Sequence, residues 1–276
     1  MRRAALLIGL FGLFNLLSLC GLAAAADVKQ GTAPSNSDSN IDPYASAPWP
    51  DMRREFLGSA PLQFDARVQV QGPAFAEDPM NVPIGIRVDP ALGAVRQIVV
   101  LVDRNPIRRV LVFAPLQALP ALAFRFKLEQ ASPVRAAVQT ADGHWHVGST
   151  WVDSAGGGCT VSGASRKDGS WAQTLGEVSG RLFSPATDQG PTRETTRLRL
   201  RVMHPMDTGL VGGVPAFYLN RLSLRDGGDR ELARLETFEP ISENPVFSFD
   251  FAEPPPGGVR IVGSDNNGNR IASPLP

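Results

Sequence analysis

Short segments of alternating apolar and polar residues, separated by turn-forming residues, constrain the fold of this chain more than any other feature. Residues 63–71 (QFDARVQVQ), 123–128 (AFRFKL) and 197–202 (RLRLRV) place every second side chain on the same face, which is typical of half-buried β-strands. Beyond an N-terminal apolar run, no stretch has the spacing of a long amphipathic helix. The sequence therefore predicts an all-β fold.

The pattern of the first half recurs in the second half. A predicted hairpin at residues 98–113 has its counterpart at residues 216–237, and residues 133–147 match residues 258–272 in order and spacing. Repetition of about seven short strands with regularly spaced turns is typical of immunoglobulin-like β-sandwiches. We therefore expect two such β-sandwich domains in tandem, joined by an irregular connector.

Residues 1–26 begin with Met-Arg-Arg, continue as a nearly uninterrupted apolar run and end in Ala-Ala-Ala. These are the features of a cleaved secretory signal peptide, although an apolar run of about 20 residues can also anchor a protein in a membrane. The expected segments are a signal peptide (1–26), a disordered leader (27–48), a first sandwich (49–155), a glycine-rich cysteine arm with connector (156–196) and a second sandwich (197–276).

Opposite charges balance, with 27 Lys and Arg against 27 Asp and Glu. No basic block is present that would track nucleic-acid phosphates, and no apolar run after the signal peptide approaches a membrane span. We therefore expect neither nucleic acid nor, once the signal is removed, a membrane as a partner.

Cys159 is the single cysteine expected in the mature protein, since Cys20 leaves with the signal peptide. It follows Gly156, Gly157 and Gly158 in the stretch DSAGGGCTVSGAS. An unpaired cysteine in an exported protein stays free, pairs with another molecule or reacts. Because glycines add no side chain to a core and are costly to order, we expect an exposed, reactive thiol on a flexible arm. The alternative is a buried cysteine that acts as a small apolar residue.

The nearest cations to Cys159 in the sequence are Arg166 and Lys167. The pKa of the thiol should therefore stay near roughly 8.5, which leaves about a few per cent as thiolate near neutrality. The segment from Asp153 to Cys159 spans at most about 20 Å when extended, enough to enter a cleft. These properties suit a carrier whose thiol is activated by the enzymes that it meets.

Two kinds of catalytic or metal site are alternatives to this interpretation. His144 and His146 lie two residues apart on a predicted strand and, with Cys159 and Met206, supply the donor types of a copper site. No His or Met follows Cys159 at the short spacing of cupredoxin-like chains, so copper is a lesser alternative. A cysteine hydrolase needs a base fixed beside the thiol, which a glycine run does not provide. We predict no resident metal, no cofactor and no enzymatic activity.

With these features in view, the chain resembles a SoxY protein joined to a SoxZ protein, the sulfur-carrier pair of bacterial thiosulfate oxidation. The arrangement is also similar to the fused SoxYZ-like carriers associated with quinoprotein alcohol dehydrogenases. The strings that carry the resemblance are VDRNPIRRVLVF (102–113), VRAAVQTADG (134–143) and the glycine-flanked Cys159 for SoxY, and MHPMDTGL (203–210), PAFYLNRLSL (215–224), ELARLETFEPISENPVFSFDF (231–251) and SDNNGN (264–269) for SoxZ.

The resemblance implies a non-enzymatic periplasmic carrier in which Cys159 holds sulfur intermediates as covalent adducts. In that family a haem enzyme joins thiosulfate oxidatively to the thiol, a hydrolase removes sulfate, and further steps oxidise the remaining sulfur. The implied partners are periplasmic redox and hydrolytic enzymes of the c-type cytochrome or quinoprotein type. The family also pairs its two sandwiches, which predicts intramolecular pairing of the two domains here.

One departure from the family bears on function. SoxY ends in Gly-Gly-Cys-Gly-Gly at a free C-terminus, whereas Cys159 is internal and is followed by Thr160. A loop held at both ends sweeps less volume than a tail, so enzymes adapted to a terminal arm can reject it. A second hypothesis is therefore a non-catalytic binding or accessory partner of a periplasmic quinoprotein alcohol dehydrogenase.

Overall fold

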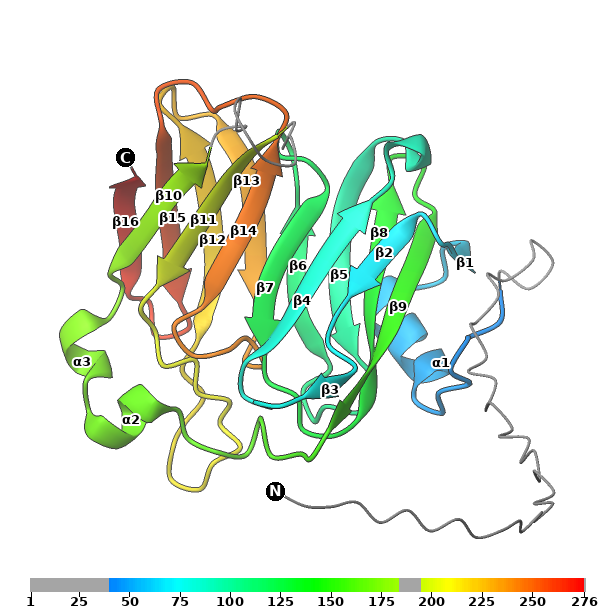
Figure 1. The fold of residues 1–276 in the computed structure, drawn as a ribbon, viewed down its shortest axis with the longest axis horizontal. Helices are drawn as coiled ribbons and strands as arrows, with labels where there is room; N and C mark the ends of the chain where they lie inside the picture. Colours follow the sequence, from blue (N-terminus) through cyan, green and yellow to red (C-terminus); the bar gives the residue numbers. More distant parts are fainter. Residues whose placement is uncertain (1–39, 184–194, 276) are drawn as a thin grey trace, which may run out of the picture. The chain divides into compact units, whose positions relative to one another are not determined.

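The computed structural model describes residues 40–183 and 195–275, so the predicted signal peptide and residues 27–39 of the leader lie outside the described residues. The described chain is built from two β-sheets with short helical segments between strands (Figure 1), which confirms the all-β prediction. The helical segments are α1 (Trp49–Met52), the π-helical η1 (Arg53–Leu57), the 3-10 helix η2 (Pro90–Leu92), α2 (Ala164–Asp168) and α3 (Trp171–Thr174).

The two sheets have ten and six strands. The ten-stranded sheet runs in the order β1 (Leu62–Phe64), β9 (Trp145–Ser154), β8 (Ser132–Thr140), β5 (Val95–Val102), β6 (Arg109–Ala114), β13 (Glu231–Thr237), β12 (Leu219–Asp226), β15 (Val259–Asp265) and β16 (Arg270–Leu275), with β3 (Phe75–Ala76) paired on β9. The six-stranded sheet runs β10 (Val178–Phe183), β11 (Thr196–Val202), β14 (Val246–Phe251), β7 (Ala121–Phe126), β4 (Val82–Val88) and β2 (Val68–Gln71).

The alternation read from the sequence determines which side chains fill the space between the sheets. In β4 the residues at every second position, Val82, Ile84, Ile86 and Val88, are buried, while their neighbours Pro83 and Arg87 are exposed. The same alternation in β7, β11 and β14 supplies one continuous apolar core that draws on strands of both sheets. Burial of this surface is the main favourable contribution to folding.

The two halves of the chain are joined through their edge strands, so each sheet continues from one half into the other. In the larger sheet β6 pairs antiparallel with β13, bringing Phe113 opposite Leu235, and in the smaller sheet β7 pairs with β14. From either end toward this junction the larger sheet reads β9-β8-β5-β6 and β16-β15-β12-β13, the order expected of two related sandwiches facing each other across a pseudo-two-fold axis. The predicted intramolecular pairing of the domains takes this form.

Two segments are more ordered than the sequence predicted. Residues 40–48, expected to belong to a disordered leader, contact the outer face of the larger sheet through Asp42. The connector, expected to be irregular, contains α2, α3 and the strand β10, which pairs along its whole length with β11. Both predictions rested on composition alone. Alternation in VSGRLF (residues 178–183) is the signal that identifies the extra strand.

Arg135 in β8 anchors the N-terminal segment to the larger sheet. Its guanidinium is fully buried, donates to both carboxylate oxygens of Asp103 at 2.8 and 2.7 Å and to Asp42 at 2.8 and 3.0 Å, and lies 4.3 Å from the ring of Trp49. A buried ion pair of this kind adds little over an apolar replacement of both partners, but removing one partner leaves an uncompensated buried charge.

No helix in the described part of the chain is long and apolar enough to cross a bilayer.

We predict that Arg135→Met lowers the free energy of unfolding by about 3 kcal/mol, because the carboxylate of Asp103 stays buried without its partner. Urea unfolding followed by tryptophan fluorescence measures this change. The matched control is Arg54→Met, which removes an exposed ion pair with Asp51 and should change stability by about 0.5 kcal/mol or less. Equal losses in the two variants would show that the buried pair is not an anchor.

We also predict that cleavage within residues 184–194 leaves the two halves associated. The cut leaves β10 on the first piece, although β10 pairs with β11 of the second piece, and β6–β13 and β7–β14 hold the sheets together. A variant with an engineered protease site in this segment should elute from a size-exclusion column at the same volume before and after cleavage. Two separate native peaks, with cleavage complete on a denaturing gel, would contradict this prediction.

Candidate functional site

The glycine segment that precedes Cys159 lies against the link between β7 and β8. After β9 ends at Ser154, the Gly157 N–H donates to the Glu129 carbonyl at 3.1 Å and the Gly158 N–H donates to the Leu128 carbonyl at 3.2 Å. The segment is thus bonded to residues some thirty positions earlier in the chain. The sequence predicted that these glycines form a flexible arm. In the structure they are packed against the β7–β8 link instead.

The geometry of this contact explains why the residues are glycines. Gly156 and Gly157 have φ of +96° and +85°, values that other residues rarely adopt. Gly158 has no positive φ, but a Cβ there would lie 2.2 Å from the Pro79 carbonyl oxygen and 2.6 Å from that of Leu128. The glycines therefore allow a close approach of backbone to backbone, a requirement distinct from mobility.

Cys159 itself is buried, and this corrects the expectation of an exposed thiol. Only 1% of the residue is accessible to solvent. Its sulfur lies 3.5 Å from the Lys127 carbonyl oxygen, and its N–H donates to Oε2 of Glu129 at 2.9 Å. The same Glu129 carboxylate accepts from the Thr160 hydroxyl at 3.1 Å. The sequence prediction took the lack of side chains on the glycines as a sign of flexibility. In the structure, the same lack of side chains allows the segment to pack closely against neighbouring backbone.

The second half of the chain covers the cysteine from the other side. The Thr208 hydroxyl donates to the Cys159 carbonyl at 2.6 Å, and the buried ammonium of Lys127 donates to the Met206 carbonyl. Both partners belong to the MHPMDTGL string at residues 203–210. Cys159 thus lies where the two halves meet, with Lys127 and Glu129 from the first half and Thr208 from the second around it.

The residues that follow the cysteine are fixed as well. Glu243 accepts from the N–H groups of Ala164 and Ser165 at 2.8 and 2.7 Å, at the start of α2. Arg166 in α2 pairs with the buried carboxylate of Asp207, with 2.9 Å between Nε and Oδ2. The cysteine is therefore held from both directions along the chain.

Burial has a direct electrostatic effect on the thiol. Desolvation, added to the negative charge of Glu129, raises the pKa of Cys159 to about 12, although the ammonium of Lys127 opposes this rise. Desolvation lowers the pKa of Lys127 to about 8. In this conformation the thiol is neutral at physiological pH and is neither a nucleophile nor a metal ligand.

The raised pKa of Cys159 makes its contribution to the stability of the closed segment depend on pH. Because the pKa of Cys159 in the folded state lies above the value of about 8.5 in an open chain, the neutral thiol favours the closed segment fully below that pH. This contribution is lost as the pH rises from there toward about 12.

The histidines singled out from the sequence are not gathered at Cys159. His146 in β9 has its Nδ1 2.8 Å from Oδ2 of Asp65, and His144 lies beside Asp142. His204 is buried; its Nδ1 accepts from the Met206 N–H at 3.1 Å, and desolvation lowers its pKa to about 4. Within residues 40–183 and 195–275, no cluster of three or more His, Cys, Asp or Glu side chains has the arrangement of a metal site.

Sequence reasoning missed Lys127, Glu129 and Thr208. Lys127 follows the alternating stretch of β7 at a position where the pattern predicts an outward side chain, yet the residue is buried. Glu129 and Thr208 are distant from Cys159 in sequence, and nothing in their spacing indicates contact. Knowledge that the halves meet at this point is required to find them.

Comparison with known proteins assigns each half of the chain. Residues 53–159 match the family model described as "Sulfur oxidation protein SoxY", and residues 187–274 match that described as "Sulphur oxidation protein SoxZ". One similar solved structure is "Structure of the sulfur carrier protein SoxY from Chlorobium limicola f thiosulfatophilum", at 20% identity and a TM-score of 0.35, covering 39% of this chain and 96% of that chain. No curated protein sequence gave a match.

We predict that Glu129→Ala makes Cys159 react with iodoacetamide about tenfold faster, because the loss of a charged hydrogen-bond acceptor lowers the cost of opening the segment by on the order of 1.5 kcal/mol. Intact-mass spectrometry over time at constant pH measures the rate. The exposed Glu253 provides the control, since Glu253→Ala should react at the wild-type rate. Wild-type protein that reacts as fast as a denatured sample would contradict a closed thiol.

Proposed function

We propose that this chain, which carries a SoxY domain at residues 53–159 and a SoxZ domain at residues 187–274, is a periplasmic carrier that holds sulfur intermediates covalently on Cys159. The protein performs no catalysis in this role. It presents the bound sulfur species to enzymes that oxidise or hydrolyse it.

The observation that carries the proposal is the position of the cysteine within the match. The SoxY match ends on Cys159 itself, and this residue is a free cysteine. Its carbonyl oxygen accepts from the Thr208 hydroxyl, which belongs to the SoxZ match, so residues of both domains hold the cysteine in place. The charges of Glu129 and Lys127 also act on the thiol, the first raising its pKa and the second lowering it.

In this proposal the closed conformation protects the free thiol of Cys159 before it is loaded. Opening requires the loss of hydrogen bonds from Glu129 and Thr208 and costs on the order of 3 kcal/mol, which leaves about one molecule in a hundred open at equilibrium. Once open, the thiol leaves its desolvated site and its pKa falls toward roughly 8.5. The thiol is then protected from unwanted oxidation when closed and reactive when a partner holds it open.

Loading follows from the chemistry of the thiol. The Cys159 sulfur forms a bond to the outer sulfur of thiosulfate, the thiol gives up its proton, and a haem partner of the c-type cytochrome kind accepts the electron pair. A hydrolase then transfers the sulfonate group to water as sulfate, leaving a sulfur atom on the cysteine. The internal loop of this chain requires partners whose clefts accept a chain that enters and leaves.

The burial of Cys159 favours a second candidate function. A thiol that stays closed would act as a small packing residue, and the chain would be a binding or accessory partner of a periplasmic quinoprotein alcohol dehydrogenase. The two functions differ in whether the sulfur atom itself is needed.

We predict that protein isolated from its native host during growth on thiosulfate carries sulfur adducts on Cys159, visible as added mass that a thiol reductant removes. Cys159→Ser should lack these masses and fail to support thiosulfate oxidation, because serine cannot form the disulfide-type bond. Wild type without any adduct, together with a Cys159→Ser strain that grows normally, would contradict the carrier and leave the accessory role.

A further inference from the structure

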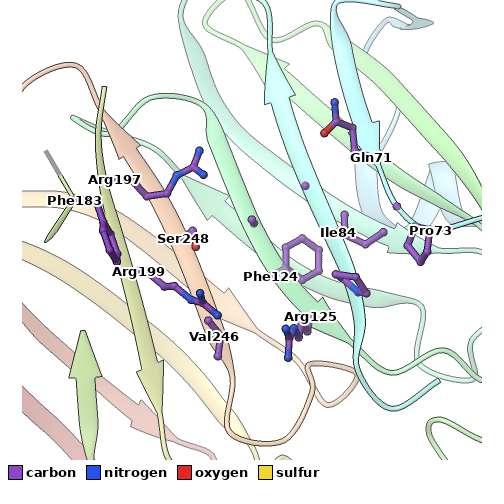
Figure 2. Close-up of a pocket in the computed structure, with 14 residues that line it drawn as sticks. Gln71, Pro73, Ile84, Phe124, Arg125, Phe183, Arg197, Arg199, Val246 and Ser248 are labelled. Carbon is purple, nitrogen blue, oxygen red and sulfur yellow. The ribbon is translucent and has the colours of Figure 1, made fainter. Parts of the chain in front are cut away.

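The outer face of the six-stranded sheet is hollowed across the junction of the two halves. Pairing in this sheet places Gly85 of β4 opposite Ala123 of β7, and Ala123 opposite Ser248 of β14. Because these adjacent residues have small side chains, a trough of about 620 Å³ forms between longer side chains on either side (Figure 2). Figure 2 shows Phe183 and Arg199 along one wall and Gln71 and Pro73 on the other.

The charge of this face has one sign. On the strands of the six-stranded sheet, the charged side chains other than Asp250 are all arginines: Arg87, Arg125, Arg181, Arg197, Arg199 and Arg201. Asp250 is bound by Arg197 at 2.6 Å. Among the described residues no carboxylate pairs with the other arginines of this face. The basic trough, defined by these arginines and the hollow, lacks internal compensation there.

The arrangement of the arginines is unfavourable to the protein alone. Arg181 of β10 lies directly opposite Arg199 of β11, and Arg201 follows on the same face. Like charges directly opposite on neighbouring strands destabilise a sheet. An anionic partner would remove this repulsion, so the cost is consistent with selection for binding.

The floor of the basic trough determines the class of anion. Its accessible apolar side chains are those of the exposed Pro83 and the half-buried Val246, and Phe183 is 39% exposed at one wall. Single-stranded nucleic acid is bound by aromatic platforms that stack successive bases, and one phenylalanine does not provide such a platform. An extended acidic peptide that also carries apolar side chains fits both the guanidinium groups and the floor.

The basic trough is connected to the segment around Cys159. Arg125 is separated from Lys127 only by Phe126, and Pro83 follows the loop whose Pro79 carbonyl abuts Gly158. A partner seated there would contact the strands that end at the cysteine. We infer that the basic trough is the docking site for an acidic, partly apolar segment of a partner protein. This inference does not depend on Cys159 carrying sulfur.

Fluorescence anisotropy with the mature chain tests the inference. The probe is a short labelled peptide in which Glu alternates with Leu and Phe. The wild type should bind it saturably, and added salt should weaken binding because exposed charges are screened. Arg125→Ala/Arg199→Ala should weaken binding at least about tenfold, since hydrogen bonds to two charged groups are lost. The control Arg225→Ala/Arg260→Ala, whose arginines pair with Asp229 in the other sheet, should bind within about twofold of wild type.

Several outcomes would overturn the inference. These are no saturable binding by wild type, equal weakening in both double variants, or equal binding of a peptide with Lys in place of Glu. Tighter binding of a single-stranded oligonucleotide would assign the face to nucleic acid instead. Cys159→Ser should bind the peptide as wild type does, so failure of the docking site and failure of the sulfur carrier give different results.

Discussion

Hydrogen bonding between edge strands of the two halves is the constraint on which the other features depend. Because β6 pairs with β13 and β7 pairs with β14, neither half has a free sheet edge at the junction. Phe113 of one sheet and Phe249 of the other meet between the layers there, with ring centroids 5.8 Å apart. A hydrophobic core shared in this way fixes the relative position of the β7–β8 link and the 203–210 loop, the two elements that enclose Cys159.

The reactivity of Cys159 is a question of access more than of intrinsic acidity. Sequence neighbours gave no reason for a shifted pKa, and in an open loop that conclusion still holds. The shift arises from desolvation and from Glu129, both of which disappear when the segment opens. Opening therefore changes exposure and acidity together, and a partner that stabilises the open loop also activates the thiol.

The strands were predictable because their apolar residues recur with a period of two, as in β4, β7 and β11. The continuation of each sheet from one half into the other could not be predicted. Nothing in the sequence of β6 or β13 distinguishes an edge strand that pairs within the chain from one that pairs with another chain. Cys159 stays the predicted site, but the sequence did not predict its burial. Gly158 shows why. A glycine that is required because a Cβ would clash with neighbouring backbone cannot be distinguished in the sequence from a glycine that gives mobility.

The fusion of the two domains gives a physical reason for the closed loop. A terminal arm loses all of its conformational freedom when it docks, whereas a loop tethered at both ends has less to lose, so a few hydrogen bonds are enough to hold it. Glu129 and Thr208 bind the cysteine backbone, and Glu243 binds the turn into α2, so both tethers are short. A chain built in this way favours the covered state unless a partner binds nearby. The basic trough lies partly on β7, and the residues that follow this strand, 127–129, pack against the loop.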